Sequence, residues 1–387
     1  MKKVFAILGV NLLILFVFLL LLELVARLVW EDKFLRDGNP YLFFKFDSEL
    51  GWVGVPNAEG FFKRGEDFDI WVSTNSRGMR DSEYMLEKRP GIIRIAVLGD
   101  SFAWGFGVTN RDNFPKILER ELQDFGPGFE VLNFGMSGYG RGQQLLQFKR
   151  EVLPFSPDAV IIMAYPGNDL YDNLADDPRL EIYPRPRFAV GKEGELKIEG
   201  LPLSPPQGDF SERYFITQTA QWMRYYTRSY LFRILFQEFV SLKKAWELEP
   251  SDFLNPVFRV DQLDRMTKQA KVEETILRDF RKLLDERGIK ALYVVATTPE
   301  QANPELRDSI ERKFPTIKVD WDQPSRLLIE AAKKNGYDVI NLRPIMEEEE
   351  NHGHPVHFNH DIHWNVMGNR VAALTLVPWA RSLPASP

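Results

Sequence analysis

The sequence predicts an α/β domain of three layers, in which helices cover both faces of a mainly parallel sheet. Two observations indicate this fold class. Short and almost wholly apolar runs recur along the chain, as expected for strands that are buried on both faces of a parallel sheet. Amphipathic segments of helical length stand between these runs, and such alternation is typical of βαβ units.

Five apolar runs are the predicted strands of this sheet. In chain order they are 92–98, Glu130–Phe134, Ala159–Ala164, Ala291–Ala296 and Tyr337–Leu342. Four helices are predicted beside them, from about Asn113 to Gln123, over 142–152, around Val272–Leu284 and from about Pro324 to Asn335. Gly288 and Gly336 follow the last two helices, where glycine commonly ends a helix. We therefore place the α/β domain in two parts, 91–175 and 266–387.

Two further segments lie outside the alternating pattern. Residues 31–90 form a predicted linker and a small β-rich lead-in, because they are rich in Gly, Asn and aromatic residues and alternate over Phe68–Val72. Residues 176–265 form a predicted insertion, whose proline-rich first part indicates an extended loop. Its second part begins with a capping-box spacing at Asp209 and Glu212 and continues as a predicted helix.

The predicted helix of the insertion is rich in aromatic residues between Trp222 and Val240. The simplest interpretation is a helix that buries these aromatic side chains on the α/β domain. A lid over a functional site and a face resting on a membrane surface are the alternatives. The sequence does not separate the three.

The first thirty residues predict a membrane anchor. Val4 to Leu22 is an apolar run in which the one polar side chain is Asn11, and as a helix it spans about 28 Å, close to the ~30 Å hydrocarbon core. No small-residue cleavage site follows, so we expect residues 1–30 to be an uncleaved transmembrane helix rather than a signal peptide or a core helix. Lys2 and Lys3 favour a cytoplasmic N-terminus. The prediction is a single-pass protein of the cell membrane with its remaining chain on the periplasmic or extracytoplasmic side.

Composition excludes several function classes. The 387 residues include no Cys, which rules out disulfides, thiolate metal sites, Fe–S clusters and a Cys nucleophile. The net charge is −6, and beyond residue 30 the chain carries 46 basic against 54 acidic side chains. Such an acidic surface is poorly suited to phosphate backbones, so no nucleic-acid partner is expected.

Polar residues follow the predicted strands, at the sheet edge where open α/β sheets bind ligands. Ser101 follows the first strand in Gly99-Asp100-Ser101, Gly138 follows the second and Asn168 follows the third. Asp361 and His363 follow the last strand and a loop. These residues supply a hydroxyl, hydrogen-bond donors and a carboxylate–imidazole pair, which is the set that acyl transfer requires.

These four segments resemble the sequence blocks of the SGNH (GDSL) hydrolase superfamily and occur in the order typical of that family. The resemblance spans about 92–175 and 268–380 and implies a flavodoxin-like three-layer fold. It implies that Ser101, Asp361 and His363 are the catalytic residues. It also implies an oxyanion hole formed by the Ser101 amide, the Gly138 amide and the Asn168 side chain.

The spacing of the last block narrows the resemblance. Asp361 and His363 are two positions apart, whereas the commonest family pattern has three steps. Asp-x-His followed by an aromatic residue and Asn resembles a subset that includes envelope-polysaccharide acetyltransferases. The implied function is a serine esterase or O-acyltransferase, without cofactor or metal, that forms an acyl-serine intermediate. The implied substrate is an acylated glycan, either of the cell envelope or exported, and the expected ester group is O-acetyl. Another small ester is the alternative substrate.

Two alternatives of other classes remain at this point. All five histidines lie between His352 and His363, and imidazole clusters bind zinc or copper, so a metal-dependent hydrolase is one alternative. Against it, Gly353–Phe358 lacks the helical i, i+4 spacing of many metal sites. The second alternative is a non-catalytic envelope protein that binds or assembles glycans on the same scaffold. Pure binding, however, needs no paired nucleophile and base.

Overall fold

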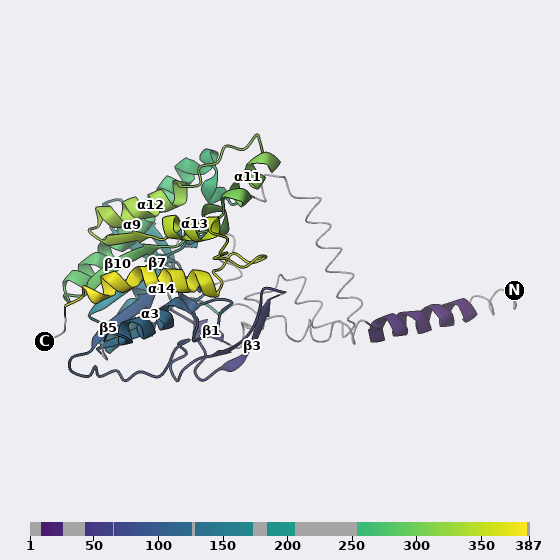
Figure 1. Ribbon diagram of the computed structural model, residues 1–387, viewed down its shortest axis with the longest axis horizontal. Coiled ribbons are helices and arrows are strands. Elements are labelled where there is room, and N and C mark those ends of the chain that lie inside the picture. Colours follow the sequence, from purple (N-terminus) through teal and green to yellow (C-terminus); the bar gives the residue numbers. More distant parts are fainter. Residues whose placement is uncertain are drawn as a thin grey trace.

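The computed structural model describes residues 9–25, 43–64, 66–125, 128–172, 184–205 and 254–384 (Figure 1). Its centre is a five-stranded sheet in which every strand pair is parallel. The strands are β5 (Ile93–Leu98), β6 (Phe129–Asn133), β7 (Ala159–Ala164), β10 (Lys290–Val295) and β11 (Asp338–Asn341). Each begins and ends within one residue of its predicted position. The predicted α/β fold with a mainly parallel sheet is confirmed.

The strand order is β11–β10–β7–β5–β6, so the chain starts the sheet near its middle. After β5 the chain adds β6 on one side and then crosses to add β7 on the other. Such a reversal is the switch point at which open α/β sheets bind ligands, beyond the carboxyl ends of the strands. β5 and β7 are buried at every position. All residues of β7 are apolar, and the one charged residue of β5, Arg94, is paired with Glu130 at 2.7 Å.

Helices cover both faces of the sheet and make two separate cores. Along β5, Ile95 and Val97 contribute to one core, whereas Ala96 and Leu98 contribute to the other. The first core includes side chains of α3 (Phe114–Gln123) and α14 (Val366–Arg381). The second includes side chains of α4 (Arg141–Gln147), α9 (Leu263–Asp285) and α12 (Gln323–Lys334). The predicted helix over 142–152 is helical throughout, but it changes from α to π geometry over Phe148–Val152.

The lead-in before β5 consists of two antiparallel hairpins. They are formed by β1 (Phe44–Asp47) with β2 (Gly51–Gly54) and by β3 (Glu59–Arg64) with β4 (Phe68–Ser73). Buried side chains of these hairpins, among them Trp52 and Phe62, belong to the same core as α4 and α9. The lead-in therefore packs directly on the α/β domain.

The first part of the predicted insertion differs from the expectation. Residues 184–205 were expected to be an extended loop, and that prediction was wrong, because β8 (Arg187–Val190) and β9 (Leu196–Glu199) pair as an antiparallel hairpin. The prolines stand outside the two strands, where they cannot interrupt the ladder. Gly194 has a φ of +82° in the turn, a conformation that suits glycine. The predicted aromatic helix and the capping pair Asp209 and Glu212 lie outside the described residues.

Residues 9–25 form a helix whose apolar side chains are exposed. Within the part of the chain that the structure describes, none of the helices has both the length and the hydrophobicity that a bilayer crossing demands. The predicted transmembrane helix over Val4–Leu22 is thus without support from the structure. Residues 1–8 and 26–42 lie outside the described residues.

Candidate active site

Ser101 lies at the carboxyl end of β5, at the switch point of the sheet. It is the first residue of a short helix, α2 (Ser101–Trp104), and the Asp100 carboxylate caps this helix by accepting the Phe102 N–H at 2.9 Å. A Cβ at Gly99 would lie 2.7 Å from the Cβ of Ala103, so only glycine allows this tight turn out of the strand. The turn fixes the Ser101 hydroxyl beyond the end of the strand.

His363 meets Ser101 from the other end of the chain. Its Nε2 lies 2.7 Å from Ser101 Oγ. The histidine lies in the loop between α13 (Arg343–Asn351) and α14. Two backbone hydrogen bonds close this loop: the Phe358 N–H donates to the His363 carbonyl at 3.1 Å, and the Asn365 N–H donates to the Val356 carbonyl at 3.0 Å. The buried Trp364 anchors the loop in the core.

Asp361 orients the imidazole from within the same loop. Its Oδ1 accepts the backbone N–H of His363 at 2.9 Å, an Asx-type turn, and also forms a short hydrogen bond with ring Nδ1. The two-residue spacing permits both bonds, because an Asx turn joins a side chain to the backbone two residues on. With Nδ1–H facing the carboxylate, Nε2 is left as the acceptor for the Ser101 hydroxyl.

Aromatic rings fix the plane of the imidazole. Phe106 stacks on His363 with ring centres 4.1 Å apart and planes at 22°. The ring centre of Phe102 lies 5.0 Å from that of the imidazole, and Phe102 is itself stacked on Tyr165 with ring centres 4.2 Å apart. His363 is buried beside these rings, and its Nε2 faces Ser101.

The protonation states suit a general base. Burial lowers the pKa of His363 and the Arg64 charge lowers it further, whereas Asp361 raises it, and the net pKa lies below the ordinary value. Burial raises the pKa of Asp361, but its hydrogen bond with His363 and the nearby positive charges outweigh this effect and lower it. Near neutral pH the pair is therefore a neutral imidazole beside a carboxylate anion.

Gly138 lies in the loop that follows β6, next to the Ser101 turn. The Met136 N–H donates to the carbonyl of Gly99 at 3.0 Å and so joins the two loops. The Tyr139 N–H closes a turn on the Met136 carbonyl at 3.1 Å, and Gly138 takes a φ of +79° at its third position, as a type II turn requires. The Trp52 indole of the lead-in supports this turn by donating to the Ser137 carbonyl at 3.0 Å.

Asn168 follows β7 on the other side of the switch point. Its Oδ1 is buried and makes no hydrogen bond within the described part of the chain. The next residue, Asp169, forms a buried ion pair of 2.9 Å with Arg141, which also contacts Glu273 at 2.8 Å. Burial raises the pKa of Asp169 well above its ordinary value, and burial also raises the pKa of Asp100 to about 7. A network of buried charges thus anchors the Asn168 loop.

Two site residues were missed by the sequence analysis. Arg64, at the end of β3, has its Nη1 2.8 Å from Asp361 Oδ2. Nothing in the sequence signals this contact, because the two residues are far apart and belong to different segments. Phe106, which stacks on His363, could have been found, since it follows the Ser101 segment directly as the aromatic residue of Gly105-Phe106-Gly107.

The histidine cluster does not converge on one point. His354 Nδ1 pairs with Glu349 at 2.9 Å, whereas the buried His357 contacts the Thr297 carbonyl at 3.2 Å through Nε2. Burial lowers the pKa of His357 to about 4. Across the segments described by the structure, no group of three His, Asp or Glu side chains is placed to hold a metal ion. The metal-site alternative gains no support from this geometry.

Two family models match the chain. Residues 97–185 match the GDSL-like lipase/acylhydrolase family, and residues 253–385 match the SGNH hydrolase-like domain of the acetyltransferase AlgX. The first segment contains Ser101, Gly138 and Asn168, and the second contains Asp361 and His363. No curated protein matches the chain.

Solved structures of low similarity were also found. The acetyl xylan esterase AlAXEase is 13% identical, and the similarity covers 75% of this chain and 100% of that one with a TM-score of 0.38. Axe2, an acetylxylan esterase from Geobacillus stearothermophilus, is 13% identical over 76% of this chain and 95% of that one, with a TM-score of 0.38.

The two family matches fall on the same segments that the fold brings together at one sheet edge. One supplies the serine and the other supplies the histidine that contacts it. Both matched segments thus resemble SGNH (GDSL) hydrolases, and together they support an ester hydrolase or acyltransferase.

Proposed function

We propose that the protein is a serine esterase or O-acetyltransferase that works through an acyl-serine intermediate. The observation that carries the proposal is the distance of 2.7 Å between Ser101 Oγ and His363 Nε2, with Asp361 on the opposite ring nitrogen. A hydroxyl becomes a useful nucleophile when an adjacent base is oriented by a third group, and these three residues have that relation.

In the first half of the reaction, Ser101 Oγ attacks the ester carbonyl carbon while its proton moves to His363 Nε2. The π electrons of the carbonyl move onto its oxygen, which becomes the oxyanion of the tetrahedral intermediate. When the intermediate collapses, the bond to the alcohol oxygen breaks and the imidazolium returns the proton to that oxygen. The products are a free alcohol and an acyl-serine. Asp361 stabilises the transient imidazolium without taking the proton.

Three donors are proposed for the oxyanion: the Ser101 amide, the Gly138 amide and the Asn168 side chain. Neither backbone amide donates a hydrogen bond to another described residue, which leaves both available. The buried ion pairs behind Asn168 support the proposal, because preorganised donors stabilise developing charge without reorganising.

In the second half, His363 takes a proton from an incoming O–H group, and that oxygen attacks the acyl-serine carbonyl. The Ser101 ester bond breaks, and the proton passes to Ser101 Oγ. Water as the incoming group gives hydrolysis, whereas a sugar hydroxyl gives transfer. The same three residues serve both outcomes.

The proposed acyl group is acetyl, and the proposed substrate is an acetylated glycan of the cell envelope. The match of residues 253–385 to an acetyltransferase domain supports acetyl. The Asp-x-His spacing, which resembles that of envelope-polysaccharide acetyltransferases, supports a glycan.

We further propose a place at the extracytoplasmic side of the cell membrane, with residues 1–30 as the anchor. The apolar run from Val4 to Leu22 and its basic N-terminal flank support this location. Exposed apolar side chains along residues 9–25 also suit contact with lipid.

Ser101→Ala should abolish hydrolysis of an aryl acetate and labelling by a fluorophosphonate, since both need the hydroxyl nucleophile. Its thermal unfolding should match the wild type. Ser325→Ala is the control, because Ser325 is a buried serine whose hydroxyl accepts a hydrogen bond from Gln301 at 2.8 Å, away from the site. Full turnover by the Ser101 variant would refute the serine mechanism and favour the glycan-binding alternative.

Asp361→Asn should lower kcat/KM by up to about 10⁴-fold, the size typical when the orienting carboxylate of such a triad is lost. The base must be neutral, so activity rises as pH rises through the His363 pKa. Because Asp361 raises that pKa, its loss should move the acidic limb of the kcat/KM profile to lower pH. Asp69→Asn, a carboxylate on β4 that pairs with Lys63, should leave both quantities unchanged. An active Asp361 variant would mean that another carboxylate orients the imidazole.

Asn168→Ala should lower kcat by about 10²- to 10³-fold with a much smaller change in KM, since an oxyanion donor binds the transition state more tightly than the ground state. Steady-state kinetics on an aryl acetate measure both constants. Asn359→Ala serves as the control, because this asparagine is exposed on the histidine loop. An effect confined to KM would show that Asn168 positions substrate instead.

The membrane proposal is tested by fractionation of cells that express the full chain. We expect the protein in the membrane fraction after alkaline carbonate washing, and a chain that lacks residues 1–30 in the soluble fraction. A C-terminal reporter that is active only outside the cytoplasm should be active. Recovery of the full chain in the soluble fraction would contradict the proposal.

A further inference from the structure

Arg64 is the one charged residue of the lead-in that an ion pair joins to the Ser101, His363 and Asp361 group in the described part of the chain. Its Nη1 lies 2.8 Å from Asp361 Oδ2, yet the geometry does not meet that of a hydrogen bond, so the contact is an ion pair. The Arg64 side chain is 57% exposed, whereas that of Asp361 is 1% exposed. Its guanidinium carbon also lies 5.9 Å from the centre of Phe106, the ring that stacks on His363.

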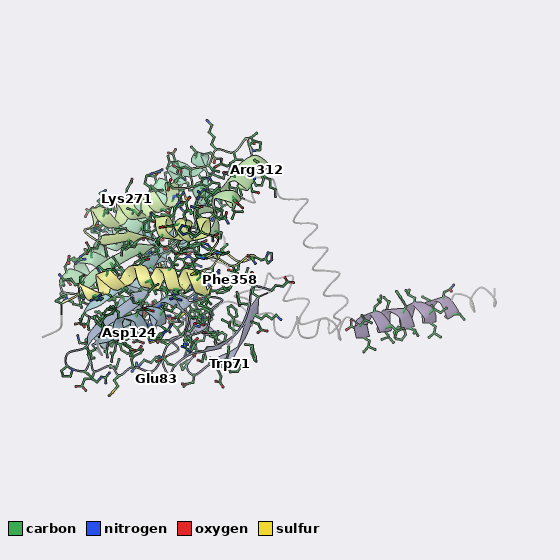
Figure 2. All side chains as sticks on the ribbon, in the orientation of Figure 1. Trp71, Glu83, Asp124, Lys271, Arg312 and Phe358 are labelled. Carbon is green, nitrogen blue, oxygen red and sulfur yellow. The ribbon has the colours of Figure 1, made fainter. Side chains whose placement is uncertain are left out.

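The hairpin that carries Arg64 is fixed to the histidine loop by separate contacts. Asp67, in the turn between β3 and β4, accepts the backbone N–H groups of Asn359 at 3.1 Å and His360 at 3.2 Å. Phe68 packs on Phe358 with ring centres 5.3 Å apart, and Figure 2 shows Phe358 close to this hairpin. Arg64 is therefore held in reach of Asp361 by the backbone, although its own side chain is largely in solvent.

The two oxygens of Asp361 are used differently. Oδ1 accepts the backbone N–H and the Nδ1–H of His363. Oδ2 is buried and makes no hydrogen bond within the described segments, so Arg64 supplies the compensating charge there. A buried carboxylate without compensation tends to take up a proton or to rotate toward another partner. Either event would remove the acceptor that orients His363.

The charged and titratable groups around His363 come from three directions. Asp361 faces it from its own loop, and Arg64 faces it from β3. His357, which stands opposite Trp364 in an antiparallel bridge, is kept neutral by burial. Tyr165, behind Phe102, is also neutral, because burial raises its pKa well above the ordinary value. Asp361 therefore favours the imidazolium, and Arg64 opposes it.

We propose that Arg64 is a positioning residue, which holds Asp361 as an anion with Oδ1 toward His363, so that the lead-in hairpin completes the catalytic group. This inference rests on the serine mechanism proposed above. It assigns to Arg64 no contact with substrate.

The test compares three variants of the full chain on a neutral aryl acetate, with kcat and KM measured across pH. Arg64→Gln removes the charge, and Arg64→Lys keeps it. Lys63→Gln is the matched control, because it removes a cation from the neighbouring position of β3 that pairs with Asp69 at 3.8 Å. A neutral substrate excludes any effect of Arg64 on substrate charge. Thermal unfolding of each variant verifies the fold.

Arg64→Gln should move the acidic limb of the kcat/KM profile to higher pH, since the cation lowers the pKa of His363. On the plateau, kcat should fall about fivefold with little change in KM, the effect expected from a partly exposed ion pair. Arg64→Lys should keep the acidic limb of the kcat/KM profile, and kcat on the plateau, close to those of the wild type. Lys63→Gln should behave as the wild type.

Three outcomes would overturn the inference. In the first, the Arg64→Gln profile coincides with that of the wild type. In the second, only KM changes, which would indicate substrate binding. In the third, Lys63→Gln shifts the limb equally, which would indicate a general effect of net charge. Ser101→Ala separates this failure from that of the serine mechanism: if Ser101→Ala is inactive and the Arg64 variants are normal, only the role of Arg64 is wrong.

Discussion

The hydrogen bond between Ser101 Oγ and His363 Nε2 is the interaction on which the whole site depends, and it joins residues from opposite ends of the domain. It can form because the helices that follow the two residues pack together. α3 follows the serine segment, α14 follows the histidine, and the Asn369 side chain on α14 accepts the first N–H of α3, that of Phe114, at 3.0 Å. A shift between these helices would separate His363 from Ser101.

Much of this arrangement could be predicted from the sequence, for identifiable reasons. The strands are mostly apolar runs, and parallel strands bring their carboxyl ends to one edge of the sheet, so Ser101 and Asn168 were expected at the same edge. Contacts that depend on how separate segments dock could not be predicted. Arg64 reaches Asp361 because the β3–β4 hairpin packs on the histidine loop. The hydrophobic pattern of either segment does not indicate this packing. β8 and β9 were missed because they are short and prolines flank them.

The buried ion pairs beside Asn168 carry an electrostatic cost. Arg141 lies fully buried between Asp169 and Glu273, and the desolvation of these charges is offset by their mutual attraction and by a hydrogen bond from Tyr293 to Glu273 of 2.9 Å. Burial raises the pKa values of Asp169 and Asp100, which reflects the cost of keeping these carboxylates charged away from water. These ion pairs tie the loop that carries Asn168 to α4 and α9.

The lead-in contacts the site at two places, the loop that carries Gly138 and the loop that carries His363. The Trp52 indole holds the Gly138 turn, Asp67 holds the histidine loop and Arg64 contacts Asp361. Trp52, Arg64 and Asp67 all lie outside the segments that match the family models, 97–185 and 253–385. Isolated two-stranded hairpins are at most marginally stable in water, so the lead-in needs the α/β domain in order to fold. The contacts that dock the hairpins are therefore also contacts with the Gly138 turn and with the loop that carries His363.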